Sequence, residues 1–344
     1  MAAHKSQGLL ALADRRRKLA ALRLRLTLIL VAAGALVALW RVTLGEWDLP
    51  LSQVVRLLSP FLPEAESLTP EALVVRSVRL PRLLSAVGTG GLLAVAGAVL
   101  QGVLANPLAE PYTLGVASGA AFGAALGFLW GGWVTPMAFV GALGALWAVN
   151  LIAWRGGGGS GAYLVLAGIV ANAVLSAGVT FIKALADDRL GAIVLWLMGS
   201  VSGASPGAAW AVWAAAAVVF FPAWLLGPRL DAVSLGEGRG ALLGVDETRL
   251  RRLLLHAASF AAAVAVSRFG IIGFVGLVVP HLVRLAVGPA HRPLLVYCFM
   301  GGGCLLAVAD GFAQRMGELP VGVLTSLIGG PFFCWLLMRR GPAR

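Results

Sequence analysis

Long uncharged stretches constrain this chain more than any other feature of its sequence. Residues 83–109 and 111–154 contain no acidic or basic side chain, and only Glu110 separates the two stretches. Over all 344 residues 59% are hydrophobic and 12% are charged, whereas soluble domains have roughly 45–50% and about 25%. A membrane-spanning helix needs about 20 mostly apolar residues, and a membrane-spanning strand would alternate apolar and polar residues. The sequence therefore predicts an all-α polytopic membrane protein.

Ten apolar runs follow one another along the chain. We expect about ten transmembrane helices, at residues 26–44, 83–104, 113–129, 134–154, 162–182, 208–226, 253–267, 269–283, 294–314 and 320–338. Residues 190–199 are apolar but too few for a further crossing, so a half-helix or surface helix is expected there. Residues 45–82 carry mixed charges and prolines, and they are expected to form short surface helices.

The amino-terminal residues 1–25 form a polar, basic tail in front of one transmembrane domain, residues 26–344. A secretory signal peptide begins in a similar way, but its apolar region is only about 7–15 residues long, so a retained first helix is favoured. With the amino terminus inside and ten crossings, both termini are cytoplasmic. Most basic residues then fall on the cytoplasmic side, as the positive-inside rule expects.

The net charge of +12 does not indicate a nucleic-acid-binding protein. Many of the basic residues flank apolar runs, where anionic lipid headgroups would meet them, and no groove-reading motif is present. The three cysteines, Cys298, Cys304 and Cys334, lie in apolar stretches without C-x-x-C spacing. This pattern favours packing over a disulfide framework or a metal site.

The chain lacks the residues that would make it an ATPase or another enzyme. It has no G-x-x-x-x-G-K-[ST] phosphate loop, and the lysines at positions 5, 18 and 183 lie outside any glycine-rich loop. No Ser/His/Asp, Cys/His or paired-carboxylate set can be placed in one pocket. The sequence therefore predicts neither catalysis nor a cofactor in this chain.

Few ionisable side chains fall inside the apolar runs. Asp310 is the clearest buried acid, and His281 and His256 are the clearest bases. Ion-coupled transporters mark their pathways with such residues, so an ion-driven secondary transporter remains an alternative. A hydrogen-bonding role is favoured for His281, because it follows Pro280 where a broken helix leaves carbonyl groups free. A membrane enzyme or scaffold is a second alternative.

A polar segment, residues 227–252, interrupts the apolar runs and contains five arginines and four acids. Apolar Leu235, Leu242, Leu243 and Val245 stand among these charges. A short amphipathic helix pair facing the cytoplasm would suit docking into a groove of a soluble partner. The alternative is a helix that lies on the lipid headgroups.

Short motifs occur from about Arg79 to the carboxyl end, over more than three quarters of the chain. They are Arg79-Leu80-Pro81-Arg82, residues 97–101, residues 106–111 (NPLAEP), 114–116 with 119–120, 235–237 with 243–245, 270–284 (GIIGFVGLVVPHLVR), 309–310, and 318–322 with 330–331. In this order they resemble the permease subunits of FecCD-type ABC importers, which take up iron chelates, haem and cobalamin. The resemblance implies structural roles for the motif residues Gln101, Asn106, Pro107, Pro280, His281, Arg284, Asp310, Pro320 and Pro331.

The resemblance implies an assembly around this chain. Two copies would form a homodimer around a central translocation path in the bacterial inner membrane. Two cytoplasmic ATPase subunits would bind ATP and Mg²⁺, and a periplasmic or lipid-anchored substrate-binding protein would deliver the cargo. The implied cargo is a large metal chelate, a ferric siderophore or haem, with cobalamin as the alternative.

The resemblance also implies roles for particular residues. The ATPase-coupling residues would be Leu235, Gly236, Glu237, Ala241, Leu243, Gly244 and Val245. Gly238 and Gly240 stand where the family commonly has an acid and an alanine, so the first coupling helix is expected to be short. Arg79, Arg82 and Arg315 would dock the binding protein; the alternative is that Arg79 and Arg82 only anchor a helix at the headgroups.

The family further implies a cytoplasmic constriction at the loop into the fifth predicted span, at Ser160 and Gly161. Asn172, Ser176 and Thr180 lie four residues apart on one face of that span. They are expected either to line the path or to form hydrogen bonds with neighbouring helices. The last span is expected to contribute Thr325 and Ser326 in the same way.

Overall fold

The computed structural model describes residues 2–339, apart from 46, 48, 60–62, 64, 65, 67, 158, 159 and 237. These residues form helices, turns and loops, and no strand occurs among them. Seven of the described helices are long and apolar enough to cross a membrane, and three further apolar helices have 10–17 residues. The chain is therefore a multi-pass membrane protein. The ten predicted runs fall on these ten helices, but because three of them are short, the count of ten crossings stays a prediction.

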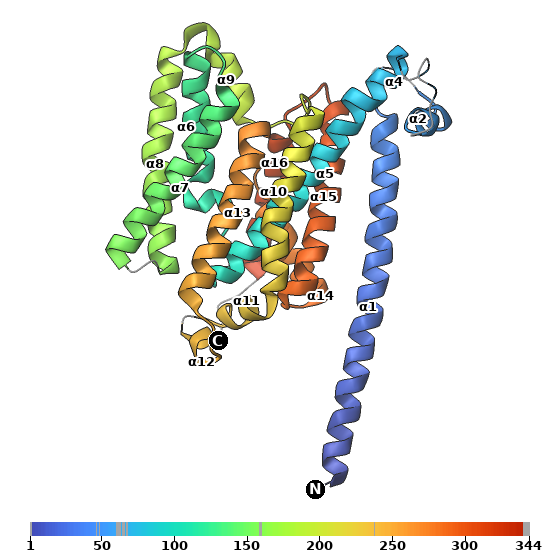
Figure 1. Cartoon of the computed structure of the whole chain (residues 1–344), viewed down its shortest axis with the longest axis vertical. Coiled ribbons are helices and arrows are strands. Elements are labelled where there is room, and N and C mark those ends of the chain that lie inside the picture. The colour runs from blue at the N-terminus through green and yellow to red at the C-terminus, as the bar shows by residue number, and fades with distance from the viewer. Residues whose placement is uncertain are drawn as a thin grey trace.

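The first helix, α1 (Ala2–Thr43), stands at the side of the bundle (Figure 1). It is continuous through the region predicted to be a polar tail, because its alanine, leucine and arginine residues all favour helix. Its contacts with the bundle are mainly with α15. Thr27 and the backbone carbonyl of Arg23 both hydrogen-bond with the hydroxyl of Tyr297, at 3.0 and 2.9 Å.

The expected surface helices of residues 45–82 are only partly separate from the bundle. One of them, α2 (Leu51–Leu57), is a short helix beside the end of α1. From Pro70 the chain is helical without a break, through α4 (Pro70–Val74), a π-helical turn η1 (Val75–Arg79) and α5 (Leu80–Val103). Thr69 starts this helix by accepting a hydrogen bond from the Ala72 N–H, with Pro70 in the first turn. The helix thus begins well before the predicted residue 83.

The central helix of the bundle is α5, which packs against α10, α13, α14 and α15. Glycines make these approaches close. A Cβ atom on Gly97 would lie 1.9 Å from the carbonyl oxygen of Gly276, and one on Gly90 would lie 2.1 Å from that of Gly302. Since lipid supplies no hydrophobic drive between helices, such close backbone packing provides much of the attraction.

The middle of the chain forms a second group of helices beside the first (Figure 1). A 3₁₀ turn η2 (Pro111–Leu114) leads into α6, which pairs closely with α7. Next come α8, a 3₁₀ turn η3 (Asp187–Arg189) and α9, the half-helix expected at residues 190–199. The bounds are α6 (Val116–Leu129), α7 (Val134–Gly157), α8 (Gly161–Leu185) and α9 (Leu190–Leu197).

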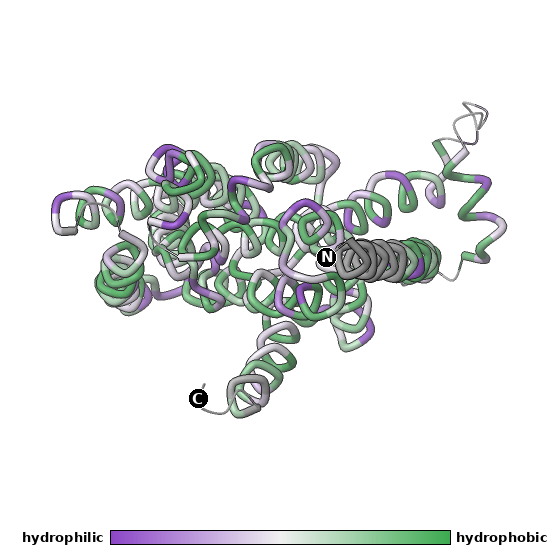
Figure 2. Tube along the Cα trace, turned by 90° about the horizontal axis from the view of Figure 1, so that it is seen from below, coloured by the Kyte–Doolittle hydropathy of each residue, from purple (hydrophilic) through white to green (hydrophobic). Residues whose placement is uncertain are grey.

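The remaining helices complete the bundle. They are α10 (Pro206–Leu225), α11 (Gly227–Val233), α12 (Arg239–Leu242), α13 (Glu247–Phe269), α14 (Val275–Val287), α15 (His291–Arg315) and α16 (Val321–Arg339). Two ends of the bundle can be told apart in Figure 1: α2 and α4 lie at the upper one, called here the α4 end, and α11 and α12 at the lower one, the α12 end. Hydrophobic residues run along outer as well as central helices (Figure 2), as expected for a protein surrounded by lipid.

Candidate functional site

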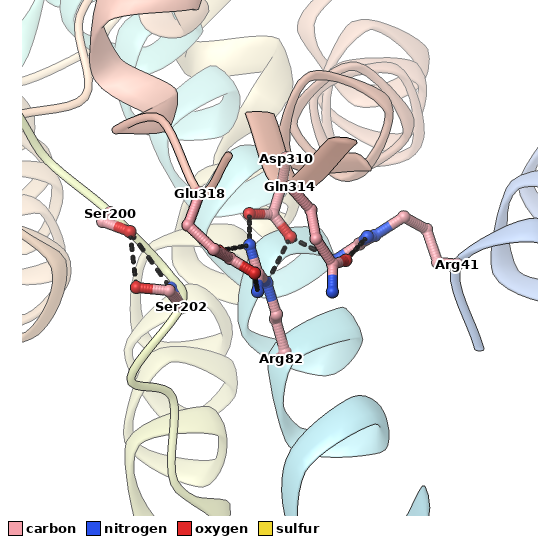
Figure 3. Close-up of polar contacts among 7 residues, drawn as sticks. All are labelled: Arg41, Arg82, Ser200, Ser202, Asp310, Gln314 and Glu318. Carbon is pink, nitrogen blue, oxygen red and sulfur yellow. Dashed lines mark hydrogen bonds and ion pairs between the residues drawn. The ribbon is translucent and has the colours of Figure 1, made fainter. Parts of the chain in front are cut away.

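A cluster of charged and polar side chains lies at the α4 end, where α1, α5 and α15 meet (Figure 3). Its centre is Asp310, which is 1% exposed. The Asp310 carboxylate accepts hydrogen bonds from Nε and Nη2 of Arg82, at 3.0 and 2.9 Å. It also accepts one from Nη2 of Arg41. We call Arg41, Arg82, Asp310, Gln314 and Glu318 the charge cluster.

The outer members of the charge cluster add two further hydrogen bonds. Nη1 of Arg41 donates to Gln314 at 2.5 Å, and Nη1 of Arg82 donates to Glu318 at 2.8 Å. The Glu318 side chain is 49% exposed, whereas both arginines are buried. Two positive and two negative groups balance, which lowers the large cost of holding charges out of water.

The predicted docking residue Arg79 is also buried. Its guanidinium donates to the backbone carbonyls of Val42, Thr43 and Trp47, at 2.9, 3.2 and 2.6 Å. These carbonyls include the last residues of α1, which have no helical partner of their own. Arg79 therefore holds the end of α1 against α5, and it lines a cavity of about 460 Å³ next to the charge cluster.

The third predicted docking residue, Arg315, is exposed at the end of α15. Its guanidinium carbon lies 5.6 Å from the centroid of the Trp40 ring, within cation–π range. Of the three arginines, Arg79 and Arg82 already have internal partners, and Arg315 presents its charge at the surface. The docking role of all three stays a prediction.

At the α12 end, the predicted coupling segment consists of two short helices separated by glycines. α11 ends at Val233 and α12 covers only four residues, because Gly236 and Gly238 adopt positive φ angles of 123° and 79° between them. The backbone N–H groups of Gly238 and Ala241 donate to the carboxylate of Glu247, which caps α12. The expected shortness of the first coupling helix agrees with this geometry.

The apolar side chains of this segment face outward. Leu235, Leu242 and Leu243 are 58%, 87% and 65% exposed. Ala241 and Gly244 are exposed as well, and Val245 and Gly236 are half-buried. Glu237, the remaining predicted coupling residue, lies outside the described residues. A short structure that exposes three leucines at one end of a membrane protein has the form of a docking surface.

Two consecutive residues at the start of α15 fasten this segment to the bundle. The backbone N–H and the Nδ1 atom of His291 lie 2.9 and 2.6 Å from Oδ1 of Asp231 on α11. Arg292 donates to the last carbonyls of α10, at Trp224 and Leu225. Burial would raise the pKa of Asp231, but the hydrogen bonds from His291 outweigh it and hold that pKa below its usual value.

The three polar residues predicted on one face of α8 have different surroundings. The Asn172 side chain accepts a hydrogen bond from Ser118 at 2.6 Å and donates to the Tyr112 carbonyl at 3.3 Å. It therefore forms the interhelical hydrogen bonds that were one of the two expectations. Ser176 and Thr180 are exposed, and Thr180 bonds only to the Ser176 carbonyl among the described residues.

The predicted gate residues lie at the α12 end of α8. Ser160 stands at its N-cap without a side-chain capping bond, and Gly161 is buried near the Leu104 backbone. On α16, Thr325 is buried and donates to the Gly322 carbonyl, while Ser326 is exposed. The exposed residues of α8 and α16 are available to line a path.

Several motif residues hold helices together. Gln101 donates to the Gly276 carbonyl and accepts from Arg284, at 3.3 and 3.0 Å, which joins α5 to α14. Asn106 accepts a hydrogen bond from the Leu108 N–H at 2.9 Å and shapes the turn after α5. Pro280 and His281 are buried inside α14, Pro331 lies inside α16, and Pro320 directly precedes α16.

Sequence reasoning missed the contacts of three residues, Arg41, Tyr112 and His291. The Tyr112 hydroxyl donates to the Ile272 carbonyl and accepts from the Ile272 N–H, at 2.9 and 3.2 Å. Arg41 stands at the end of an apolar run, where an arginine can also face the lipid headgroups, so its position gave no signal of a buried ion pair. Only His291, directly before Arg292 at the start of a run, offered a signal, as a possible cap. No group of three metal-ligating side chains occurs within the described part of the chain.

These features together define a helical multi-pass membrane protein, with internally paired charges at one end and an exposed apolar segment at the other. The model of the FecCD transport family matches residues 26–339. The chain belongs to the FecCD transport family and is therefore a membrane permease.

Named relatives and a solved structure agree with this family. The hemin transport system permease protein HmuU of Yersinia pestis is 41% identical over 287 residues, covering 78% of this chain and 84% of that protein. The cobalamin import system permease protein BtuC of Halobacterium salinarum is 41% identical over 276 residues, covering 78% and 74%. A solved transporter, described as of the metal-chelate ABC type and inward-facing, has 30% identity and a TM-score of 0.79 over 92% of this chain and 98% of its own.

Proposed function

We propose that this chain is the permease subunit of an ABC importer that moves a large metal chelate, a ferric siderophore or haem, into the cytoplasm. Relatives of comparable identity are named for hemin, for cobalamin and for an iron chelate, so cobalamin is the second candidate. The single observation that carries the proposal, beyond family membership, is the segment of exposed leucines at the α12 end. Such a surface suits docking onto a soluble partner, and an ABC importer supplies one in its ATPase.

The proposed assembly is a homodimer around a central path, with two ATPase subunits and a substrate-binding protein. The exposed faces of α8 and α16, with Ser176, Thr180 and Ser326, would line the path, and Ser160 and Gly161 would narrow it. The α12 end would face the cytoplasm and carry the ATPase subunits. Both termini would then lie in the cytoplasm of a bacterial inner membrane.

The α4 end would receive the binding protein. Arg315 is the exposed one of the three predicted docking arginines, and it would pair with a carboxylate of the partner. Arg79 and Arg82 would act from beneath, by fixing α1 and α15 in place, unless docking exchanges Glu318 for an incoming carboxylate on Arg82. Charge complementarity at such a rim governs mainly the association rate.

Reconstitution tests the proposal. Proteoliposomes that contain the permease, its ATPase and its binding protein are loaded with ATP inside and offered hemin, a ferric siderophore or cobalamin outside. Uptake of one iron chelate that stops without ATP supports the proposal, and uptake of cobalamin alone selects the second candidate. Accumulation driven by an ion gradient in vesicles holding only this chain would refute the ABC assignment.

A further inference from the structure

One face of α13 is basic at the α12 end and apolar toward the middle of the helix. Arg249, Arg252 and His256 follow one another at the α12 end, three and four residues apart, and Leu253 and Phe260 continue the face toward the middle. All five side chains are exposed. The face therefore carries charge near the membrane surface and apolar groups deeper in the membrane.

Two cavities lie on either side of this face. The larger, about 630 Å³, opens toward α10 and is lined by Val218, Arg249, Arg252, Leu253, His256, Ala257 and Phe260. The smaller, about 280 Å³, opens toward α7 and is lined by Trp147, Asn150, Leu151, Trp154, Arg252 and His256. Arg252 and His256 line both cavities, so they stand where the two adjoin. We call the larger cavity the groove and its α12 end, with Arg249, Arg252 and His256, its mouth.

The polar groups at this mouth are held in position. The Arg252 guanidinium lies 4.8 Å from the centroid of the Trp154 ring, and among the described residues no acceptor hydrogen-bonds to it. Nδ1 of His256 lies 2.7 Å from the Arg252 carbonyl, which can only accept, so Nδ1 carries the proton and Nε2 is left for another partner. Arg249 pairs with Asp246 at 3.0 Å.

The apolar floor continues toward the other membrane surface. Val218 and Phe260 also line a third cavity of about 410 Å³, whose far end carries Arg268. From Arg249 to Arg268, α13 rises about 29 Å at about 1.5 Å per residue. This length matches the hydrocarbon core of a bilayer, about 30 Å. The groove therefore runs through the membrane with a cation at each end.

We propose that this groove binds an anionic phospholipid from the leaflet at the α12 end. The lipid phosphate lies against Arg252 and Arg249, with His256 Nε2 beside it, and one acyl chain follows Leu253, Ala257, Phe260 and Val218. A soluble protein can reach the guanidinium groups but not the apolar floor, which lies within the span. The cation–π contact with Trp154 holds Arg252 in place, and its planar guanidinium suits two phosphate oxygens. That this leaflet is the cytoplasmic one rests on the proposed function; the site itself does not.

Native mass spectrometry of the purified full-length permease tests the site. The protein is titrated separately with phosphatidylglycerol and phosphatidylcholine of the same chain length. We expect the wild type to bind phosphatidylglycerol more tightly. Arg252→Gln is expected to weaken it about fivefold, which is the effect of one basic residue near an anionic surface. Arg249→Gln with Arg252→Gln is expected to weaken it more, and to weaken phosphatidylglycerol binding more than phosphatidylcholine binding, because both lipids carry the phosphate but only phosphatidylglycerol carries a net negative charge.

The matched control is Arg155→Gln, since Arg155 is an exposed arginine at the same end of the bundle that lines neither cavity. A second variant, Leu253→Asn, tests the acyl contact and is expected to weaken both lipids equally. Equal binding of the two lipids by the wild type overturns the proposal, as does equal behaviour of the Arg252 and Arg155 variants.

Loss of the ATPase, with lipid binding unchanged, in the Arg252 variant would assign the arginines to a protein partner and also overturn the proposal. Lipid binding is measured on the permease alone. Failed transport in the reconstituted system would therefore count against the proposed function without affecting this result.

Discussion

The two ends of this permease differ in which unfavourable groups they contain: the α4 end has buried charges, and the α12 end has exposed leucines. At the α4 end Asp310 and Arg82 are almost fully buried, yet each charged atom has a partner on a neighbouring helix. At the α12 end Leu242 and Leu243 are 87% and 65% exposed, in a segment with short helices and few internal contacts. The charges at the α4 end are paired within one chain, whereas these two leucines at the α12 end are left uncovered by the described residues.

The physical reason is that an unpaired buried charge costs more free energy than an exposed apolar side chain. A buried charge must be paired at short range by the same fold, because an unpaired one costs several kcal/mol. An exposed leucine costs less, so the chain can fold with it exposed. Its burial against a partner would contribute about 1.5–3 kcal/mol to the free energy of association. Changes at the α4 end should therefore affect folding, and changes at the α12 end should affect assembly.

The largest effect is expected from Asp310→Ala. It leaves Arg41 and Arg82 buried without their shared carboxylate, and the cost of breaking such a pair is about 3–5 kcal/mol. Thermal unfolding of the purified permease should show a strongly lowered midpoint. The matched change Glu318→Gln removes a half-exposed partner and should cost less than about 1 kcal/mol. Equal effects of the two variants would show that the cluster is not organised around Asp310.

The next largest effect concerns the α12 end. Leu242→Ser with Leu243→Ser should leave the unfolding midpoint of the permease unchanged, because both side chains are exposed. Association with the ATPase should weaken by at least tenfold, since each buried leucine contributes about 1.5–3 kcal/mol. Co-purification or binding isotherms measure it. The control is Leu285→Ser, a 71% exposed leucine on α14 outside the coupling segment; wild-type ATPase binding by the double variant would remove the contrast between the two ends.

A smaller effect is expected for binding-protein capture. Arg315→Gln should lower the association rate of the binding protein several-fold at low salt and much less at high salt, because rim charges act through steering. Stability should change little, since Arg315 is exposed. Arg82→Gln, in contrast, should lower stability first. If Arg82→Gln left stability intact and abolished capture, Arg82 would be the docking residue itself.

The smallest effect is expected from the Asp231–His291 pair, which fastens the α12 end to the bundle. Because the pKa of Asp231 is lowered, its pairing with His291 stabilises the fold above the usual aspartate value of about 3.9 and is lost as the pH falls through the lowered value. Asp231→Asn should therefore lower the unfolding midpoint slightly at pH 5. The difference should shrink below about pH 4. A difference that grew as the pH fell from 5 to 3 would contradict this sign.

Much of the architecture could be predicted from the sequence. The apolar runs locate the long helices, and the apolar residues 190–199 locate α9. Gly238 was expected to shorten the coupling helix and does precede α12 with a positive φ, whereas Gly240, expected to act in the same way, lies inside α12. These features depend on local composition and backbone freedom. The helix starts were less accurate: α13 begins at Glu247, where Asp246 accepts a hydrogen bond from the Arg249 N–H, six residues before the predicted start.

The partners of individual polar residues could not be predicted in the same way. Arg82 and Arg315 look alike in the sequence, as basic residues at the ends of apolar runs, yet one is paired with Asp310 and the other is exposed. Asn172 and Ser176 share a helix face, yet only Asn172 reaches a neighbouring helix. Which of them is buried depends on contacts between residues far apart in the chain, such as the 228 positions between Arg82 and Asp310.

That this chain is a helical membrane permease of the FecCD family follows from its sequence, because hydrophobic run length and motif order are properties of the chain alone. Which charges are neutralised inside the protein and which remain exposed could be learned only from the packed helices. The reason is that Coulomb attraction and hydrogen bonding act over a few ångströms, and those distances exist only once α1, α5 and α15 have packed together.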